Sequence, residues 1–203
     1  MTTRARVDAP IEPQRLDEVL DVAAALFHEK GYRSTSLTDI GNLLGIHKAS
    51  LYHYVSSKEE LLRRVVFRAS AQLRDMSTDP RLSEFSPPVA LERLVRSHCE
   101  VLMAHPHEFG VLIDQRRHIE ACVIEEIAVR ERAYVVAVRR VIERGVATGD
   151  FRSVDSGVAT RLLFELANSV LRWFRPGGRL SEAEVINEVW TFVSGGLLEP
   201  TQE

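Results

Sequence analysis

Apolar residues recur at intervals of three and four along nearly the whole chain, and this spacing restricts the protein to helices. Alternation of apolar and polar residues, the pattern of a half-buried strand, is nearly absent. We therefore expect an all-α fold of about nine helices. The clearest apolar stripe lies between residues 14 and 30 and consists of Leu16, Val19, Leu20, Ala23, Ala24 and Phe27.

Glycine, proline and capping residues divide this pattern into separate helices. Gly45 and Pro106 interrupt it, and Ser-x-x-acidic capping boxes begin at Ser36, Ser57 and Ser181. The sequence therefore predicts helices over residues 14–30, 36–44, 48–54, 57–73, 87–104, 108–116, 119–147, 156–174 and 181–194.

The two short helices at 36–44 and 48–54 are joined by a turn at Gly45, which is the arrangement of a helix-turn-helix. In that motif the start of the second helix meets base edges in the major groove. Leu51 is the expected core anchor, and Lys58 would bring a cation and free N–H groups toward phosphate. An ordinary helical hairpin with a polar surface remains an alternative. The polar face of the second helix carries Lys48, Ala49, Ser50, Tyr52 and His53.

Charge and composition set limits on function without indicating nucleic acid. The formal net charge is −3, and residues 1–65 carry nine basic and nine acidic side chains. The two cysteines, Cys99 and Cys122, fit no zinc-ligand spacing. No apolar run reaches the ~18 residues of a membrane helix, and the first 13 residues lack a signal-peptide core. We expect a reduced, cytoplasmic protein with no membrane partner and a disordered arm at 1–13.

The segment from Phe27 to Leu62 resembles the DNA-binding domain of the TetR family of regulators. The matching features are Phe27 with Gly31, Ser34 to Thr38, Ile40-Gly41, Gly45-Ile46, Leu51 to Tyr54, and Lys58 with Leu61. The resemblance implies a three-helix DNA-binding domain at 14–60, with the helix-turn-helix at about 36–55, and a helical ligand-binding and dimerisation domain at 61–203. Carried over, the residues expected at double-stranded DNA are Ser36, Thr38, His47, Lys48, Ala49, Ser50, Tyr52, His53 and Lys58.

Two positions depart from the family pattern. Gly41 replaces the usual alanine, which costs a helix about 1 kcal/mol. His47 stands where a serine or threonine commonly caps the recognition helix. Either the helix is capped more weakly, or His47 itself contacts DNA.

The family resemblance also implies a homodimer that pairs through the last two helices, 156–174 and 181–194. A dimer predicts a pseudo-palindromic operator with half-sites about one helical turn apart. The alternative is that these helices simply complete the core. Their apolar residues are Leu162, Leu163, Leu166, Val170, Val185, Val189, Trp190 and Val193.

Residues 80–203 carry no recognisable catalytic set, phosphate loop or zinc-protease motif, so we expect no enzyme and no resident cofactor or metal. The family implies instead a repressor that a small-molecule effector releases from its operator. The segment 171–178 resembles a subgroup that includes regulators of sterol-ring catabolism, which respond to CoA thioesters. The candidate effector-binding residues are Phe164, Asn168, Arg172, Trp173 and Arg175.

The role of these five residues has two interpretations. Arg172 and Arg175 beside aromatic rings would suit a CoA phosphate or a carboxylate. Alternatively, Arg172 pairs with an acid across the dimer, and Trp173 packs in the interface. Phe164 and Asn168 differ from what the sterol regulators carry nearby, which leaves the acyl group open.

Two further interpretations of the C-terminal half remain. His98 and His105 share a helical face near Cys99, His107 and His118, and such a cluster would suit zinc or copper. Against a metal sensor, His105 lies at a helix break and no second chelating pair is obvious. In the other interpretation this half only dimerises and takes no ligand.

Overall fold

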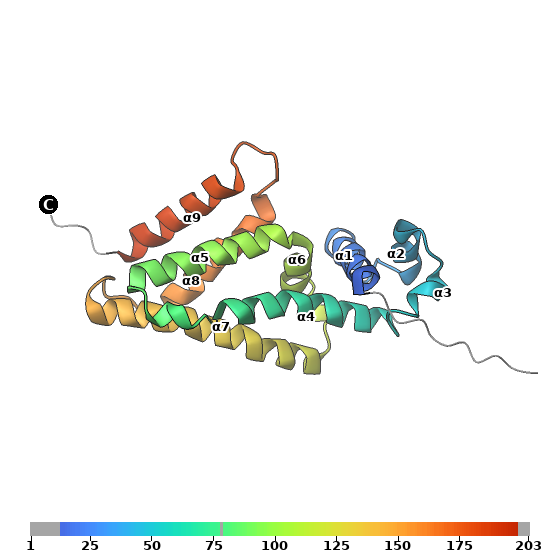
Figure 1. Cartoon of the computed structure of the whole chain (residues 1–203), viewed down its shortest axis with the longest axis horizontal. Coiled ribbons are helices and arrows are strands. Elements are labelled where there is room, and N and C mark those ends of the chain that lie inside the picture. The colour runs from blue at the N-terminus through green and yellow to red at the C-terminus, as the bar shows by residue number, and fades with distance from the viewer. Residues whose placement is uncertain (1–12, 78, 199–203) are drawn as a thin grey trace, which may run out of the picture.

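The computed structural model describes residues 13–77 and 79–198, and the elements within these ranges are helical (Figure 1). The predicted arm at 1–13 lies outside them except for Pro13, which begins the first helix. The two ranges contain nine α-helices and two 3₁₀ turns: α1 (Pro13–Glu29), α2 (Leu37–Leu44), α3 (Lys48–Leu51), α4 (Lys58–Ser77), η1 (Pro80–Ser83), α5 (Pro87–Ala104), α6 (Pro106–Asp114), η2 (Arg116–His118), α7 (Ala121–Thr148), α8 (Ser156–Trp173) and α9 (Glu182–Leu197).

The helices form two groups that share one long helix. Figure 1 shows α1, α2 and α3 gathered at one end, around the start of α4, and α5, α8 and α9 at the other. Helix α4 packs against α1, α5, α6 and α7, and α6 packs against α1. Since α4 runs through residues 60 and 61, where the two domains were expected to meet, one continuous helix belongs to both parts.

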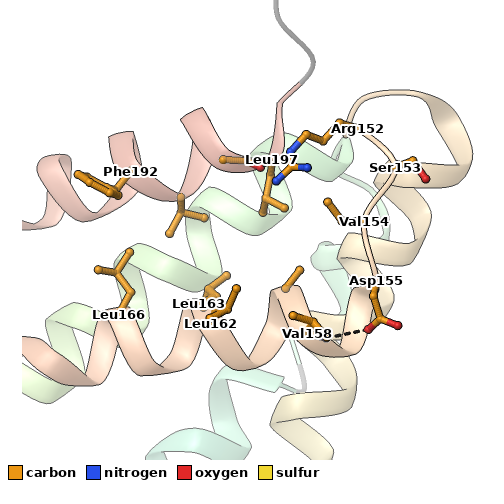
Figure 2. A pocket seen from close by; sticks show the side chains of 13 residues that line it. Arg152, Ser153, Val154, Asp155, Val158, Leu162, Leu163, Leu166, Phe192 and Leu197 are labelled. Carbon is orange, nitrogen blue, oxygen red and sulfur yellow. Dashed lines mark hydrogen bonds between the residues drawn. The ribbon is translucent and has the colours of Figure 1, made fainter.

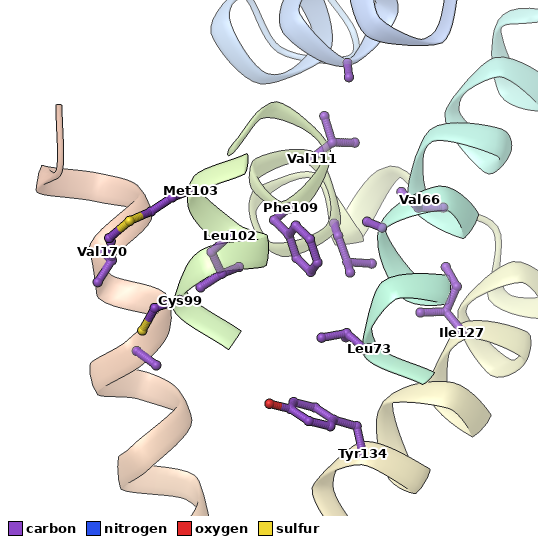
Figure 3. Packing of buried hydrophobic residues seen from close by; sticks show 14 of the residues in the cluster. Val66, Leu73, Cys99, Leu102, Met103, Phe109, Val111, Ile127, Tyr134 and Val170 are labelled. Carbon is purple, nitrogen blue, oxygen red and sulfur yellow. The ribbon is translucent and has the colours of Figure 1, made fainter. Parts of the chain in front are cut away.

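A single buried cluster runs through both groups. It extends from Phe27 in α1 to Val193 in α9 and contains the apolar stripe predicted for the first helix, of which Leu16 is only half-buried. Figure 3 shows its middle portion, where Leu102 of α5 lies between α8 and Phe109 of α6. The cysteines are unpaired, with Cys99 buried and Cys122 exposed. Within the described ranges, no helix is long and apolar enough to cross a membrane.

Capping chemistry matches the sequence at two of the three predicted boxes. Those at Ser36 and Ser181 are complete. At the start of α4 the Ser57 hydroxyl accepts a hydrogen bond from the Glu60 backbone N–H at 3.1 Å. The Glu60 carboxylate, however, accepts from the Ser56 N–H at 2.6 Å. The return half of this box therefore lies one residue earlier than predicted.

Several helix boundaries differ from prediction: α4 runs to Ser77 instead of 73, α6 ends at Asp114 instead of 116, and α9 runs to Leu197 instead of 194. Three further differences have a local cause. Helix α3 ends at Leu51 instead of Tyr54, because the Leu51 carbonyl accepts from both the Tyr54 and the Val55 N–H in a closing turn. Helix α6 starts at Pro106, whose fixed φ suits the first turn of a helix. Helix α7 begins two residues late, at Ala121, because a 3₁₀ turn precedes it.

Candidate DNA-binding surface and effector cavity

The helix-turn-helix is held by a close backbone contact. The Ile46 N–H donates to the Gly41 carbonyl at 2.9 Å, and a Cβ at position 41 would lie 2.8 Å from the Ile46 oxygen. Leu51, fully buried, anchors α3 beneath this turn, as expected. The departure at Gly41 thus has a structural reason that the sequence did not show: the turn after α2 lies too close for a side chain.

The nine candidate DNA-binding residues lie at the start of α2, on α3 and its following turn, and at the start of α4. Seven of them are exposed, and Ser50 and Lys58 are half-buried. The Ser36 hydroxyl is engaged in capping, since it accepts from the Asp39 N–H at 3.1 Å. His47 occupies the N-cap of α3 without a side-chain capping bond, which leaves its imidazole free for another contact. The contacts of these residues with DNA remain predictions.

The side chain of Lys58 packs on the ring of Tyr32. Tyr32 was not identified as a functional residue from the sequence. The Lys58 Nζ atom lies 4.2 Å from the centre of the Tyr32 ring and 3.5 Å from the Arg33 carbonyl. Burial lowers the pKa of Lys58, and burial, followed by the Glu59 carboxylate, raises the pKa of Tyr32 to about 12. The only feature of the sequence that could have indicated Tyr32 is its position directly after Gly31, the glycine that ends the first helix.

Tyr32 also contacts the C-terminal part of the chain. Its backbone N–H donates to Oε1 of Gln115 at 3.3 Å. Its ring stacks against His118, with centroids 5.9 Å apart. Gln115 and His118 lie in the connection between α6 and α7. The Tyr32 ring that supports Lys58 therefore contacts the same connection whose Arg116 lines the inner cavity described next.

An inner cavity of about 320 Å³ lies among α4, α5, α6, α7 and α8. Most of its walls are apolar, and Figure 3 shows Leu73, Phe109 and Tyr134 facing this region from three helices. One wall carries an ion pair in which the two terminal nitrogens of the Arg116 guanidinium, Nη1 and Nη2, donate to the Glu131 carboxylate at 2.7 and 2.9 Å. The lining consists of Leu73, His98, Phe109, Leu112, Ile113, Arg116, Glu131, Tyr134, Val135, Phe164 and Asn168.

An outer cavity of about 610 Å³ lies among α1, α6 and the end of α8. Arg172 and Arg175 line it, are exposed, and make no ion pair with another described residue. The full lining is His28, Glu29, His107, Gly110, Ile113, Asp114, Asn168, Leu171, Arg172 and Arg175.

The structure divides the five candidate effector residues among three places. Phe164 lines the inner cavity, Arg172 and Arg175 line the outer one, and Asn168 lines both. Trp173 lines neither: it is 51% exposed, and its indole N–H donates to the Ser169 hydroxyl at 3.2 Å. Grouping Trp173 with the arginines was a consequence of their closeness in sequence, because successive residues on a helix point in different directions.

His98 is the buried polar residue of the inner cavity. Its Nε2 lies 3.0 Å from Oδ1 of Asn168. Its ring packs against Tyr134 and Phe164 at centroid distances of 5.7 and 5.4 Å, and these two rings also contact each other at 5.3 Å. Burial lowers its pKa to about 4, so the imidazole is neutral near pH 7.

The histidines proposed as a metal cluster are not brought together. His98 faces Asn168, His105 faces Glu108 at 3.5 Å, and His107 pairs with His28 at 3.3 Å between Nδ1 atoms. Among the residues that the structure describes, no three potential ligands of the His, Cys, Asp and Glu types form a metal-binding group. The spacing of seven was misleading because His105 lies outside α5, with non-helical backbone angles at the break before α6, while His107 and His118 belong to α6 and η2.

A groove of about 460 Å³ separates α8 from α9 (Figure 2). Along α8, Val158, Leu162 and Leu166 follow one another in Figure 2, with Phe192 of α9 across from Leu166 and Leu197 toward the end where Val158 lies. Val158, Leu162 and Phe192 are 58%, 64% and 76% exposed. Of the apolar residues predicted to pair two subunits, five are instead buried in the core of the same chain: Leu163, Val170, Val185, Val189 and Val193.

An exposed recognition helix at one end and a hollow helical bundle at the other, joined by α4, define a one-component transcriptional regulator. The family model for bacterial regulatory proteins of the tetR family matches residues 19–65, and that for the tetracyclin repressor-like C-terminal domain matches residues 84–197. The chain belongs to the TetR family.

Individual relatives agree with this assignment over the full length. The HTH-type transcriptional repressor KstR2 of Rhodococcus jostii is 31% identical over 98% of this chain and 99% of its own. The structure of the ketosteroid transcriptional regulator KstR2 of Mycobacterium tuberculosis superposes with a TM-score of 0.82 at 27% identity, over 95% of this chain and 99% of that one. AibR, in complex with isovaleryl coenzyme A and operator DNA, has a TM-score of 0.77 at 22% identity, over 88% and 97%, and shares the fold.

Proposed function

We propose that the chain is a homodimeric, cytoplasmic transcriptional repressor that leaves a pseudo-palindromic operator when an acyl-CoA thioester occupies its cavities. It acts as a regulator and not as an enzyme. The observation that carries the effector assignment is the meeting of an apolar inner cavity with an outer cavity that holds Arg172 and Arg175.

The two cavities complement the two ends of a thioester. An acyl group is apolar and suits the walls formed by Phe109, Leu112 and Phe164. Coenzyme A carries phosphates, for which the two arginines provide planar, multiply donating partners. The combined space also disfavours a C-terminal half that only dimerises. Two relatives support the proposal: KstR2 is a repressor by name, and AibR holds a CoA thioester in the same fold.

The dimer is proposed to form through α8 and α9, as the resemblance implied. The supporting observation is the cluster of exposed apolar side chains, Val158, Leu162 and Phe192, around the groove between these helices. Exposed apolar groups that lie together on a soluble protein commonly mark a protein interface. A two-fold dimer would present two copies of α3 to successive turns of the major groove.

The test is operator release measured by fluorescence anisotropy. The DNA is a duplex selected by the protein from a random-sequence pool, and the effectors are saturated acyl-CoA thioesters of four to twelve carbons, free CoA and the free acids. We expect a thioester to release the DNA from the wild-type protein, and not from a variant with Arg172→Ala and Arg175→Ala.

Arg179→Ala is the matched control, because Arg179 is exposed in the same connection but lines neither cavity. Release by no thioester would reject the effector assignment and leave DNA binding intact. Failure to select any duplex would reject the repressor assignment itself.

A further inference from the structure

The inner and outer cavities meet at two residues. Ile113 and Asn168 line both of them, and Asn168 is the polar member of the pair. A molecule with its apolar end in the inner cavity and its charged end beside Arg172 must therefore pass the Asn168 side chain. Whatever group joins the two ends of that molecule lies next to the amide.

The His98 contact determines which end of the amide faces the passage. The Asn168 oxygen can only accept, so the 3.0 Å contact requires a proton on Nε2 of His98. The neutral ring then has a bare Nδ1, which is buried and has no hydrogen-bond partner among the described residues. Reversing the amide would require the proton on Nδ1, which would leave a buried N–H donor unpaired, a rarer and costlier state.

In this orientation Asn168 presents Nδ2, with two N–H donors, away from His98. No hydrogen bond joins Nδ2 to another described residue, and the Asn168 side chain is only half-buried, at the border of two cavities. The border of the two cavities therefore carries an oriented N–H donor beside the apolar side chain of Ile113. Such a donor favours a ligand with a hydrogen-bond acceptor at this point and disfavours one without it.

We propose that Asn168, oriented by His98, recognises the carbonyl oxygen of the thioester at the junction of the two cavities. The inference rests on the proposed function and specifies how that site reads its effector. The thioester carbonyl lies between the acyl chain and the CoA arm and is an acceptor without a donor, which matches the amide N–H groups. His98 acts as a positioning residue, which packs in one cluster with the rings of Tyr134 and Phe164 and is not itself in contact with the carbonyl.

The experiment compares two ligands that differ in one carbonyl group. Octanoyl-CoA is a thioester, whereas S-octyl-CoA is the thioether with the same chain length, the same phosphates and no acyl carbonyl. Their dissociation constants are measured by calorimetry with the wild-type dimer. We expect the thioester to bind about 10-fold more tightly, the value for one hydrogen bond in a partly buried site.

Two variants locate the source of that preference. Asn168→Leu removes the donor at similar volume, and His98→Phe keeps the ring stacking but frees the amide to rotate. We expect each to reduce the preference to about 3-fold or less, while S-octyl-CoA affinity stays close to that of the wild type. Ser169→Ala, next to Asn168 but lining neither cavity, is expected to keep the full preference. Operator binding and thermal melting establish that each variant is folded.

Each outcome has a distinct meaning. Equal affinity of the wild type for the two ligands would overturn the carbonyl inference and leave the effector proposal standing. A preference that survives in Asn168→Leu would assign the carbonyl to another donor and also overturn it. Binding of neither ligand would overturn the effector proposal together with this inference.

Discussion

Gly110 of α6 lies directly against the imidazole of His28 in α1, so closely that a Cβ at position 110 would be 2.5 Å from two ring atoms. His28 also pairs with His107 of α6, and the His28 Nε2 atom lies 4.0 Å from Oδ2 of Asp114. Helix α1 belongs to the DNA-binding part, and α6 borders both cavities. The two parts are therefore in direct contact at Gly110 and His28, beside the outer cavity that both residues line, and we expect a displacement of α6 by a ligand to reach α1.

A methyl group at position 110 should disturb this contact. We expect Gly110→Ala to push α6 away from α1, to lower the free energy of unfolding by roughly 1–3 kcal/mol, and to weaken operator binding in the absence of effector. Thermal melting and anisotropy measure the two effects. Gly195→Ala is the control, since a Cβ added at position 195 would have no atom within 4 Å. Normal operator affinity in Gly110→Ala would show that the α1–α6 contact does not transmit the state of the sensor.

Gly41 permits a second test, in which the family's usual residue is restored. Helix propensity alone predicts that Gly41→Ala stabilises α2 by about 1 kcal/mol. The Ile46 carbonyl, 2.8 Å from the added Cβ, is backbone and cannot swing aside. We therefore expect net destabilisation and weaker DNA binding, because the turn that sets the angle of α3 must open. A higher melting temperature for this variant would contradict the close contact.

What the sequence predicted correctly is local in origin. The capping boxes at Ser36 and Ser181 and the anchor at Leu51 depend on residues near one another in the chain. By contrast, Asn168 lines both cavities whereas Trp173 is exposed, and this difference depends on which helices pack against α8. Periodicity gives the apolar face of a helix but not its partner, which is why it could not separate the core residues of α8 and α9 from an interface.

Arg68 of α4 forms ion pairs with α1 in the DNA-binding part and with α6 in the C-terminal part. It donates to Asp21 of α1 at 2.5 Å and to Glu108 of α6 at 2.7 Å, and Glu108 is only 7% exposed. Arg68→Met leaves that buried carboxylate without its main partner, so we expect a loss of about 2–3 kcal/mol in the free energy of unfolding by urea. The double variant with Glu108→Gln should recover at least half of the loss. An unchanged single variant would mean that the contact is solvated and weak.

The burial of His98 predicts a dependence of stability on pH. Its pKa is about 4 in the folded protein because burial opposes the charged form, whereas an unfolded histidine titrates near its ordinary pKa of 6.5. Below pH 6.5 the unfolded chain gains a proton that the folded chain does not, so this stabilising contribution is lost as pH falls from 6.5 toward 4. Burial also lowers the pKa of His28, which acts in the same direction.

At pH 5 the His98 contribution amounts to about 2 kcal/mol. Between pH 7 and pH 5 the free energy of unfolding should fall by about 2 kcal/mol less in His98→Phe than in the wild type. Urea titrations at each pH measure this difference. His53→Phe is the control, because it also replaces one histidine by phenylalanine but at an exposed position after α3, so its pH profile should follow that of the wild type. Parallel pH profiles for wild type and His98→Phe would show that His98 is hydrated or charged in the folded state.

The exposed ring of Phe192 tests the dimer. Because it is 76% exposed within one chain, Phe192→Asp removes little packing from the monomer but places a charge in the apolar groove of the proposed interface. Light scattering should show a monomer that melts as one folded unit. Operator affinity should fall at least 100-fold, since a monomer binds one half-site without the contribution of the other. Val129→Asp is the matched control: Val129 is 60% exposed on α7 and lies outside the groove, so this variant should remain a dimer with full affinity. A dimeric Phe192→Asp protein would place the two-fold axis on another face.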